Sequence, residues 1–170
     1  MTERESAIVV RVSVPAAIER LRRDHDRAAR LGVPPHVTIL YPFVPVTELT
    51  PAIRDDLARI AGEFRSFRVT FFEAVRWAGL VCLMPEPSAP FTGLIDRVGA
   101  CFPEHPPYAG AISEVIPHLT VVESTSVPLD EVVAGAAGSL PFDAAADALE
   151  VLAQVDGGRW RRRWRLPFKP

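Results

Sequence analysis

The sequence predicts an α+β fold in which two similar lobes form a single bilobal domain over residues 1–170. Its 170 residues are 48% hydrophobic, which is enough to bury one core. Seventeen prolines and ten glycines divide the chain into short elements. The order strand, helix, strand, helix, strand occurs twice at a period of about 80 residues, which is too long for a solenoid and indicates a duplicated lobe.

The first lobe begins with a β-branched strand over residues 7–14 and a helix over residues 15–32. One side of this helix carries Ile18, Leu21 and Ala28, and its arginines lie on the other. A strand over residues 36–43 follows. Thr50 then caps a second helix, and a strand over residues 67–72 ends the lobe.

The second lobe repeats this order. Its predicted elements are a strand over residues 79–84, a helix over 90–101, a proline-rich loop over 102–108, a strand over 118–123, a helix from about 129, and strands near 146–155 and 159–166. Gly157 and Gly158 between the last two strands strongly indicate a β-hairpin.

The composition excludes several classes of protein. Nineteen Lys and Arg against 21 Asp and Glu give a net charge of −2, which excludes a histone-like polycation and argues against disorder. Cys82 and Cys101 are too few for a disulfide framework, so we expect a reducing, cytoplasmic location. The apolar run over residues 7–14 is too short to span a membrane, and charges of both signs precede it, so it does not resemble a secretory signal.

Two strands at matching positions of the lobes carry the same pattern, in each case after a proline. The first reads HVTI from His36 and the second reads HLTV from His118. Because side chains alternate along a strand, each histidine and threonine share one face and the apolar residues share the other. A lone His-x-Thr means little, since a strand histidine is more often structural than catalytic. Its recurrence in both lobes indicates a site, with the two pairs facing each other across a cleft.

This set of side chains suits phosphodiester cleavage without a metal ion. Two imidazoles titrate near neutrality, so one can take a proton while the other gives one. The hydroxyls of Thr38 and Thr120 can donate to phosphate oxygens in the transition state. No cysteine or carboxylate stands at zinc-ligand spacing from either histidine, and the sequence has no Walker A, G-x-S-x-G or G-x-G-x-x-G motif. We therefore expect neither a metal nor a cofactor.

The paired tetrapeptides from His36 and His118 resemble the motifs of the 2H phosphoesterase superfamily, also called the 2′-5′ RNA ligase-like family. The duplicated order of elements is similar along nearly the whole chain. The resemblance implies two antiparallel sheets backed by helices around a central cleft. It also implies that His36 and His118 are the acid and base, that Thr38 and Thr120 bind phosphate, and that the substrate is a 2′,3′-cyclic phosphodiester or a 2′-5′ linkage.

Four further residues are weaker candidates for binding substrate. Tyr41 and Tyr108 could stack on a base, although packing in the core or anchoring of a loop also accounts for them. Strict alternation in the last strand would put Trp160, Trp164, Leu166 and Phe168 on one face and Arg159, Arg161, Arg163 and Arg165 on the other. Arg161 and Arg163 could then hold RNA phosphates, and the alternative is a solvated edge strand whose arginines prevent aggregation.

The function expected from these observations is hydrolysis of a 2′,3′-cyclic phosphate, at an RNA end or in a nucleotide, to a 2′-phosphate. Ligation of RNA ends through a 2′-5′ linkage is one alternative, and a non-catalytic module that binds RNA or a cyclic nucleotide is another. The intact pair of histidines argues against the last of these, because binding alone needs cations and not a titrating pair. The expected partner is an RNA end or a small nucleotide, with no DNA and no membrane, and we expect a monomer.

Overall fold

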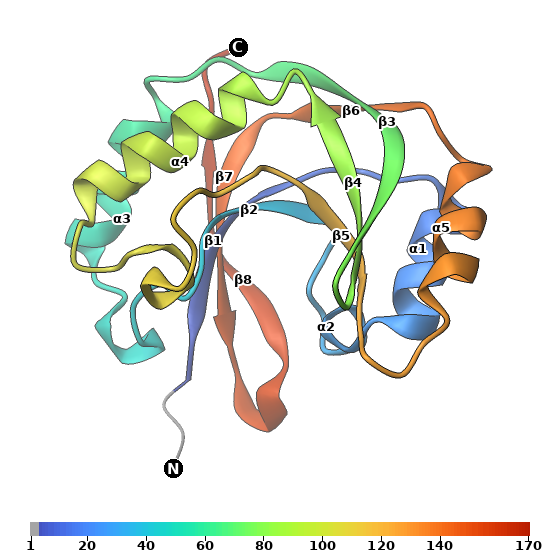
Figure 1. Cartoon of the computed structure of the whole chain (residues 1–170). Helices are drawn as coiled ribbons and strands as arrows, with labels where there is room; N and C mark the ends of the chain where they lie inside the picture. Colours follow the sequence, from blue (N-terminus) through green and yellow to red (C-terminus); the bar gives the residue numbers. More distant parts are fainter. Residues whose placement is uncertain (1–3) are drawn as a thin grey trace.

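The computed structural model describes residues 4–170 as one curled sheet of eight strands with helices on its flanks (Figure 1). The strands are β1 (Ser6–Arg11), β2 (His36–Leu40), β3 (Phe67–Trp77), β4 (Leu80–Glu86), β5 (Leu119–Glu123), β6 (Phe142–Ala146), β7 (Ala148–Gln154) and β8 (Trp160–Pro167). The helices are α1 (Ala16–His25), α2 (Arg27–Arg30), α3 (Pro51–Ala61), α4 (Ala89–Cys101) and α5 (Leu129–Ala137). The α+β class predicted from the sequence is confirmed.

The sheet is continuous, whereas the family resemblance implied two separate sheets. Its order is β6-β3-β4-β5-β2-β1-β7-β8, and every described pairing between these strands is antiparallel. The two halves join between β2 and β5, where the only paired positions are Val37 and Leu119. The expected lobes are therefore two four-stranded halves connected by a narrow junction, and this junction lies between the two motif strands.

The halves also exchange strands. The strand β3 closes the first repeat in sequence, but its neighbours in the sheet are β4 and β6 of the second repeat. The strand β7 belongs to the second repeat and pairs with β1 of the first. Each half of the sheet is thus built from both halves of the sequence.

Several elements differ from their predicted bounds. The single helix expected over residues 15–32 is interrupted at Asp26, where the backbone is extended and the side chain accepts a hydrogen bond from the backbone N–H of Ala29 at 3.0 Å. The strand β3 continues to Trp77 because β4 pairs with its second part. The strand expected near residues 146–155 is β7, and the strand β6 that precedes it was not predicted.

The main core lies between one face of the sheet and the helices. Alternating residues such as Ile8 and Val10 of β1 are fully buried in it, together with apolar residues of α1, α3, α4 and α5. A second, smaller cluster contains Ala7 and Val9, which alternate with them and so lie on the opposite face of β1. This opposite face is the one that the helices leave uncovered.

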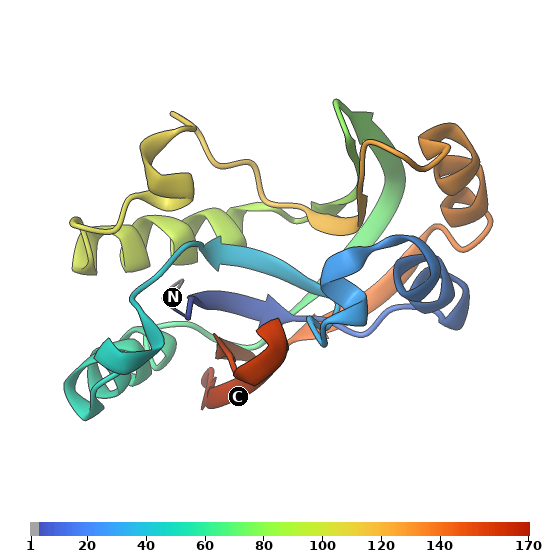
Figure 2. The ribbon, with the colours of Figure 1, turned by 90° about the horizontal axis from the view of Figure 1, so that it is seen from below.

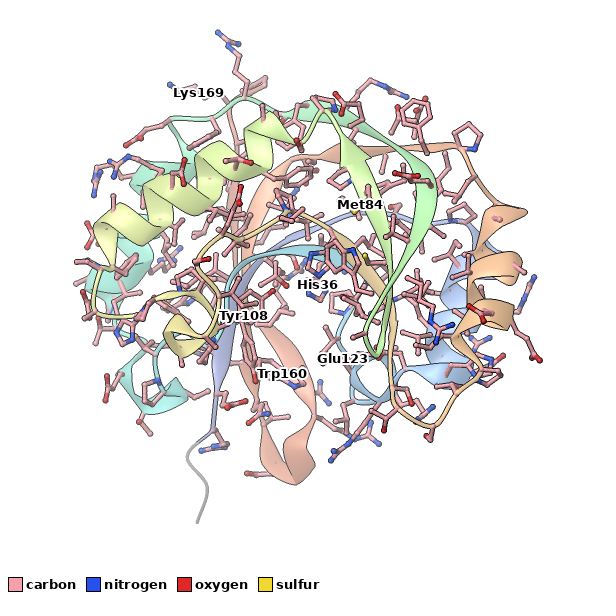
Figure 3. All side chains as sticks on the ribbon, in the orientation of Figure 1. His36, Met84, Tyr108, Glu123, Trp160 and Lys169 are labelled. Atoms are coloured by element: carbon pink, nitrogen blue, oxygen red, sulfur yellow. The ribbon has the colours of Figure 1, made fainter. Side chains whose placement is uncertain are left out.

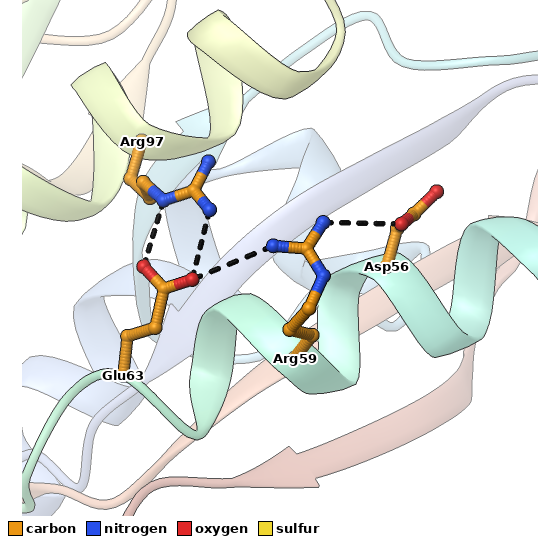
Figure 4. Close-up of polar contacts among 4 residues, drawn as sticks. All are labelled: Asp56, Arg59, Glu63 and Arg97. Carbon is orange, nitrogen blue, oxygen red and sulfur yellow. Dashed lines mark hydrogen bonds and ion pairs between the residues drawn. The ribbon is translucent and has the colours of Figure 1, made fainter.

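The helices form two pairs on opposite flanks of the sheet, α3 with α4 and α1 with α5 (Figures 1 and 2). A surface ion pair connects α4 with Glu63, just after the end of α3 (Figure 4). The Arg97 guanidinium donates two hydrogen bonds to the Glu63 carboxylate at 2.7 and 2.8 Å, and Arg59 contacts both Glu63 and Asp56. Within residues 4–170, no helix has both the length and the apolar character needed to cross a membrane.

Candidate active site

The two motif strands present their histidines and threonines on the uncovered face of the sheet. Val37 and Leu119 are fully buried in the main core, and the four polar side chains that flank them are half-buried on the other face. Because the strands are antiparallel and paired at Val37 and Leu119, His36 is the counterpart of Thr120, and His118 is the counterpart of Thr38. The register brings the four predicted residues together in the middle of the sheet.

Both imidazole rings are fixed in the same way. Nδ1 of His36 lies 2.7 Å from the carbonyl oxygen of Pro34, and Nδ1 of His118 lies 2.7 Å from that of Ile116. A carbonyl can only accept a hydrogen bond, so Nδ1 carries the proton in both rings. Each Nε2 is therefore left for a proton transfer, and that of His36 lies 3.1 Å from Oγ1 of Thr38.

The surroundings of His36 favour its neutral form. Burial lowers the pKa of His36 to about 4, against the effect of its hydrogen bond to the Pro34 carbonyl. The positive charge of Arg22 and the neighbouring His118 act in the same direction as burial. At neutral pH this ring is a neutral imidazole with an available lone pair on Nε2.

Matching bulges place one further residue of each motif strand on the site face. The pairing of β2 with β1 skips Ile39, and the pairing of β5 with β4 skips Val121. Two consecutive apolar residues therefore enter the core after each threonine, and the next residue returns to the face of the histidine. These residues are Tyr41, directly after β2, and Glu123 in β5.

The two candidate tyrosines lie on the site face but in different surroundings. The Tyr41 hydroxyl donates to Oε2 of Glu5 at 2.7 Å, and its ring lies against Trp160 with centroids 6.2 Å apart. Burial and the Glu5 carboxylate raise the pKa of Tyr41 to about 12. Tyr108 is half-buried and its backbone N–H donates to the Tyr41 carbonyl at 2.7 Å. Figure 3 shows Tyr108, Trp160 and Glu123 around His36.

The alternation expected in the last strand is wrong. Its pairing with β7 skips Arg163, so Trp164 enters the main core, whereas Trp160 lies in the small cluster on the opposite face. Arg162 pairs with Leu152 on that same face and contacts the buried carboxylate of Glu150 at 3.0 Å. Arg161 lies on the other face of β8. A contact of Arg161 or Arg163 with substrate stays a prediction.

Arg22 is a residue of the site region that the sequence analysis missed. It was placed on the solvent side of its helix, yet it is only 2% exposed. Its guanidinium donates to the backbone carbonyls of Thr120 at 3.3 Å and Val33 at 3.1 Å. A signal was present, because Arg22 follows the buried Ile18 by four residues and therefore lies on the same side of the helix.

Asp26 completes this contact between the helices and the second motif strand. Its Oδ1 accepts a hydrogen bond from the backbone N–H of Glu123 at 3.3 Å, and the residue is 2% exposed. Arg22 and Asp26 therefore bind β5 on both sides of its bulge. The side chains hold the backbone that carries Thr120.

Chemically, the site offers two ring nitrogens and two hydroxyls on one face of two paired strands. Such a group can donate hydrogen bonds to an anion and move protons on two sides of it. Among residues 4–170, no three His, Cys, Asp or Glu side chains are grouped so that they could hold a metal ion.

Comparisons with known proteins identify a family and similar folds. A family model described as the 2′-5′ RNA ligase superfamily matches residues 10–158. A search of curated proteins found no match. Among solved structures, Escherichia coli LigT complexed with 3′-AMP superposes with a TM-score of 0.60 at 18% identity, covering 99% of this chain and 100% of that one.

Two other solved structures superpose on this chain with similar TM-scores and identities. A protein described as a phosphoesterase has a TM-score of 0.56 at 18% identity and covers 99% of this chain and 100% of its own. The protein TT0787 of Thermus thermophilus has a TM-score of 0.60 at 15% identity, with 97% of this chain and 98% of that chain covered. At these identities the likeness shows a shared fold.

Proposed function

Because the chain belongs to the 2′-5′ RNA ligase superfamily, we propose that it is a two-histidine phosphoesterase that opens 2′,3′-cyclic phosphates to 2′-phosphates. The observation that carries the proposal is the shared anchoring of His36 and His118. Both rings direct Nδ1 to a backbone carbonyl and leave Nε2 available, on strands that pair side by side. This arrangement supplies one acid and one base to a single phosphate.

The different surroundings of the histidines support an assignment of roles. His36, which is neutral at working pH, takes the proton of the attacking water as its oxygen bonds to phosphorus. The bond from phosphorus to the ribose 3′-oxygen breaks, and protonated His118 gives its proton to that oxygen. Thr38 and Thr120 donate hydrogen bonds to the non-bridging oxygens, where negative charge accumulates. These groups are all side chains of this chain, so the proposed reaction uses no metal ion.

The test is an assay of the four nucleoside 2′,3′-cyclic monophosphates and of a short RNA that ends in a cyclic phosphate. The expected product is the 2′-phosphate, assigned by NMR, at a rate that EDTA leaves unchanged. Loss of activity in EDTA and recovery with a divalent ion would contradict the proposed chemistry. A parallel reaction with an added 5′-hydroxyl RNA end tests ligation, which would appear as a joined product in place of the 2′-phosphate.

A further inference from the structure

A cavity of about 210 Å³ lies directly beside His118. Trp77, at the end of β3, and His118 form one side of it, and the loop before β5 forms the other. The loop residues that line it are Tyr108, Ile112, Glu114, Val115 and Ile116. The rings of Trp77 and His118 meet edge to face, with centroids 5.1 Å apart and an angle of 73°. The cavity is therefore in direct contact with the proposed acid.

The walls of this cavity are mostly apolar although they face solvent. Ile112 and Ile116 are 47% and 48% exposed, and they are two of the three large hydrophobic residues exposed within residues 4–170. Exposed apolar residues that gather around a hollow mark a binding site more often than chance exposure does. Two aromatic residues, Trp77 and Tyr108, provide flat apolar surface in the same hollow.

On the His36 side of the site, two aromatic side chains pack against each other. Tyr41 packs there against Trp160, and both contact the small apolar cluster of Ala7, Val9 and Leu152. The Tyr41 hydroxyl is held by Glu5, which fixes the ring in place. The two motifs are alike, but the apolar cavity lies beside His118, whereas Tyr41 and Trp160 pack together on the His36 side.

The loop that carries Tyr108 is held in a defined position. The backbone N–H of Tyr108 donates a hydrogen bond to the Tyr41 carbonyl at 2.7 Å. Tyr108 and Ala109 both have φ of 52°, a left-handed conformation that residues other than glycine rarely adopt. Contacts with the rest of the chain must therefore hold Tyr108, and its ring forms a preformed wall of the cavity.

We propose that this cavity is the subsite for the nucleobase of the substrate, and this proposal rests on the proposed function for the position of the phosphate. A base has the flat apolar faces that Trp77 and Tyr108 can stack against. A second phosphate is disfavoured, because Glu114 is negative and no arginine or lysine lines the cavity among the described residues. The volume is below the roughly 300–1,000 Å³ of pockets for drug-sized ligands, so it suits one base and not a second nucleotide.

The experiment compares two ligands that differ only in the base. Calorimetry measures the affinity of adenosine 2′-phosphate and of 1-O-methylribose 2′-phosphate, which has the same phosphate and a methoxy group in place of the base. Stacking of one base contributes about 1–3 kcal/mol, so the wild-type protein should bind the adenosine compound about 5- to 150-fold more tightly. Binding needs no turnover, so this measurement is independent of whether cyclic phosphates are opened.

Ile112→Trp fills the cavity and should bring both affinities to the same value. Tyr108→Ala removes one wall and should reduce the preference at least 5-fold. Phe72→Trp is the matched control, because Phe72 is 59% exposed on β3 and does not line the cavity, and it should keep the full preference. Far-ultraviolet circular dichroism checks that each variant is folded.

Each result distinguishes the two proposals. A base preference that Ile112→Trp removes supports the subsite even if no cyclic phosphate is opened, in which case only the proposed reaction fails. Equal affinities in the wild type, no binding of either compound, or an unchanged preference in Ile112→Trp would overturn the subsite, whatever the outcome of the turnover assay.

Discussion

At the scale of single residues, His36 and His118 are anchored alike but are not equivalent. His36 lies close to the buried Arg22, whereas His118 borders an open cavity. Closely similar tetrapeptides can therefore place their histidines in different surroundings, as a reaction with one acid and one base requires. The fold supplies this difference through the residues that surround each ring.

The first prediction concerns the pH dependence of kcat/KM, which reports the free enzyme. Burial lowers the pKa of His36 to about 4, so the base loses activity only as the pH falls through that value. The acid limb of the profile should therefore lie near pH 4. An acid limb between about pH 6 and 7, where an unperturbed histidine titrates, would show that His36 is not the base.

The second prediction concerns the four motif residues. Acid or base catalysis contributes about 10²–10⁴-fold, so His36→Ala and His118→Ala should each lower kcat by that order. The double variant should be only slightly worse than either single one, because both serve the same step. Thr38→Ala and Thr120→Ala should cost less, since each removes one hydrogen-bond donor and leaves proton transfer intact. A double histidine variant with wild-type turnover would make these motifs structural.

At the scale of elements, one-residue bulges decide which side chains reach the site. The bulges at Ile39 and Val121 bring Tyr41 and Glu123 to the site face, and the irregularity at Arg163 moves Trp160 there. Sequence alternation predicts the histidines and threonines correctly because they precede the bulges. It fails beyond them, since a bulge depends on the partner strand and leaves no periodic signal.

The third prediction concerns Arg22 as a positioning residue. In Arg22→Met the carbonyls of Thr120 and Val33 lose their donor, and the free energy of unfolding should fall by about 1–3 kcal/mol. Arg23→Met is the matched control, because Arg23 is the next residue and is exposed, and it should unfold like the wild type.

A purely structural residue would change only the free energy of unfolding. Arg22 also lowers the pKa of His36 through its positive charge. Loss of that charge should move the acid limb of the kcat/KM profile to higher pH. Arg22→Lys keeps the charge, so its acid limb should stay closer to the wild-type position. An unchanged acid limb in Arg22→Met would contradict the electrostatic part of this role.

At the scale of the whole molecule, the sequence predicts the duplication but not how the copies are joined. The paired motifs and the repeated order of elements indicate two lobes, and two four-stranded halves are present. Which strand pairs with which is a tertiary property, so the exchange of β3 and β7 between halves has no local signal. For the same reason the narrow junction at Val37 and Leu119 could not be foreseen.

The last prediction follows from this exchange. A fragment of residues 1–78 would contain β1, β2 and β3, but both sheet neighbours of β3 lie in the other fragment. A fragment of residues 79–170 would contain β7 and β8 without β1, and β4 and β6 without the strand that lies between them. An isolated pair of strands is marginally stable at best, so neither fragment should show a cooperative unfolding transition by circular dichroism.

An equimolar mixture of the two fragments should recover a transition, because all eight strands are then present. Cooperative unfolding of either fragment alone would show that the chain consists of two independent domains, against the single domain predicted for residues 1–170.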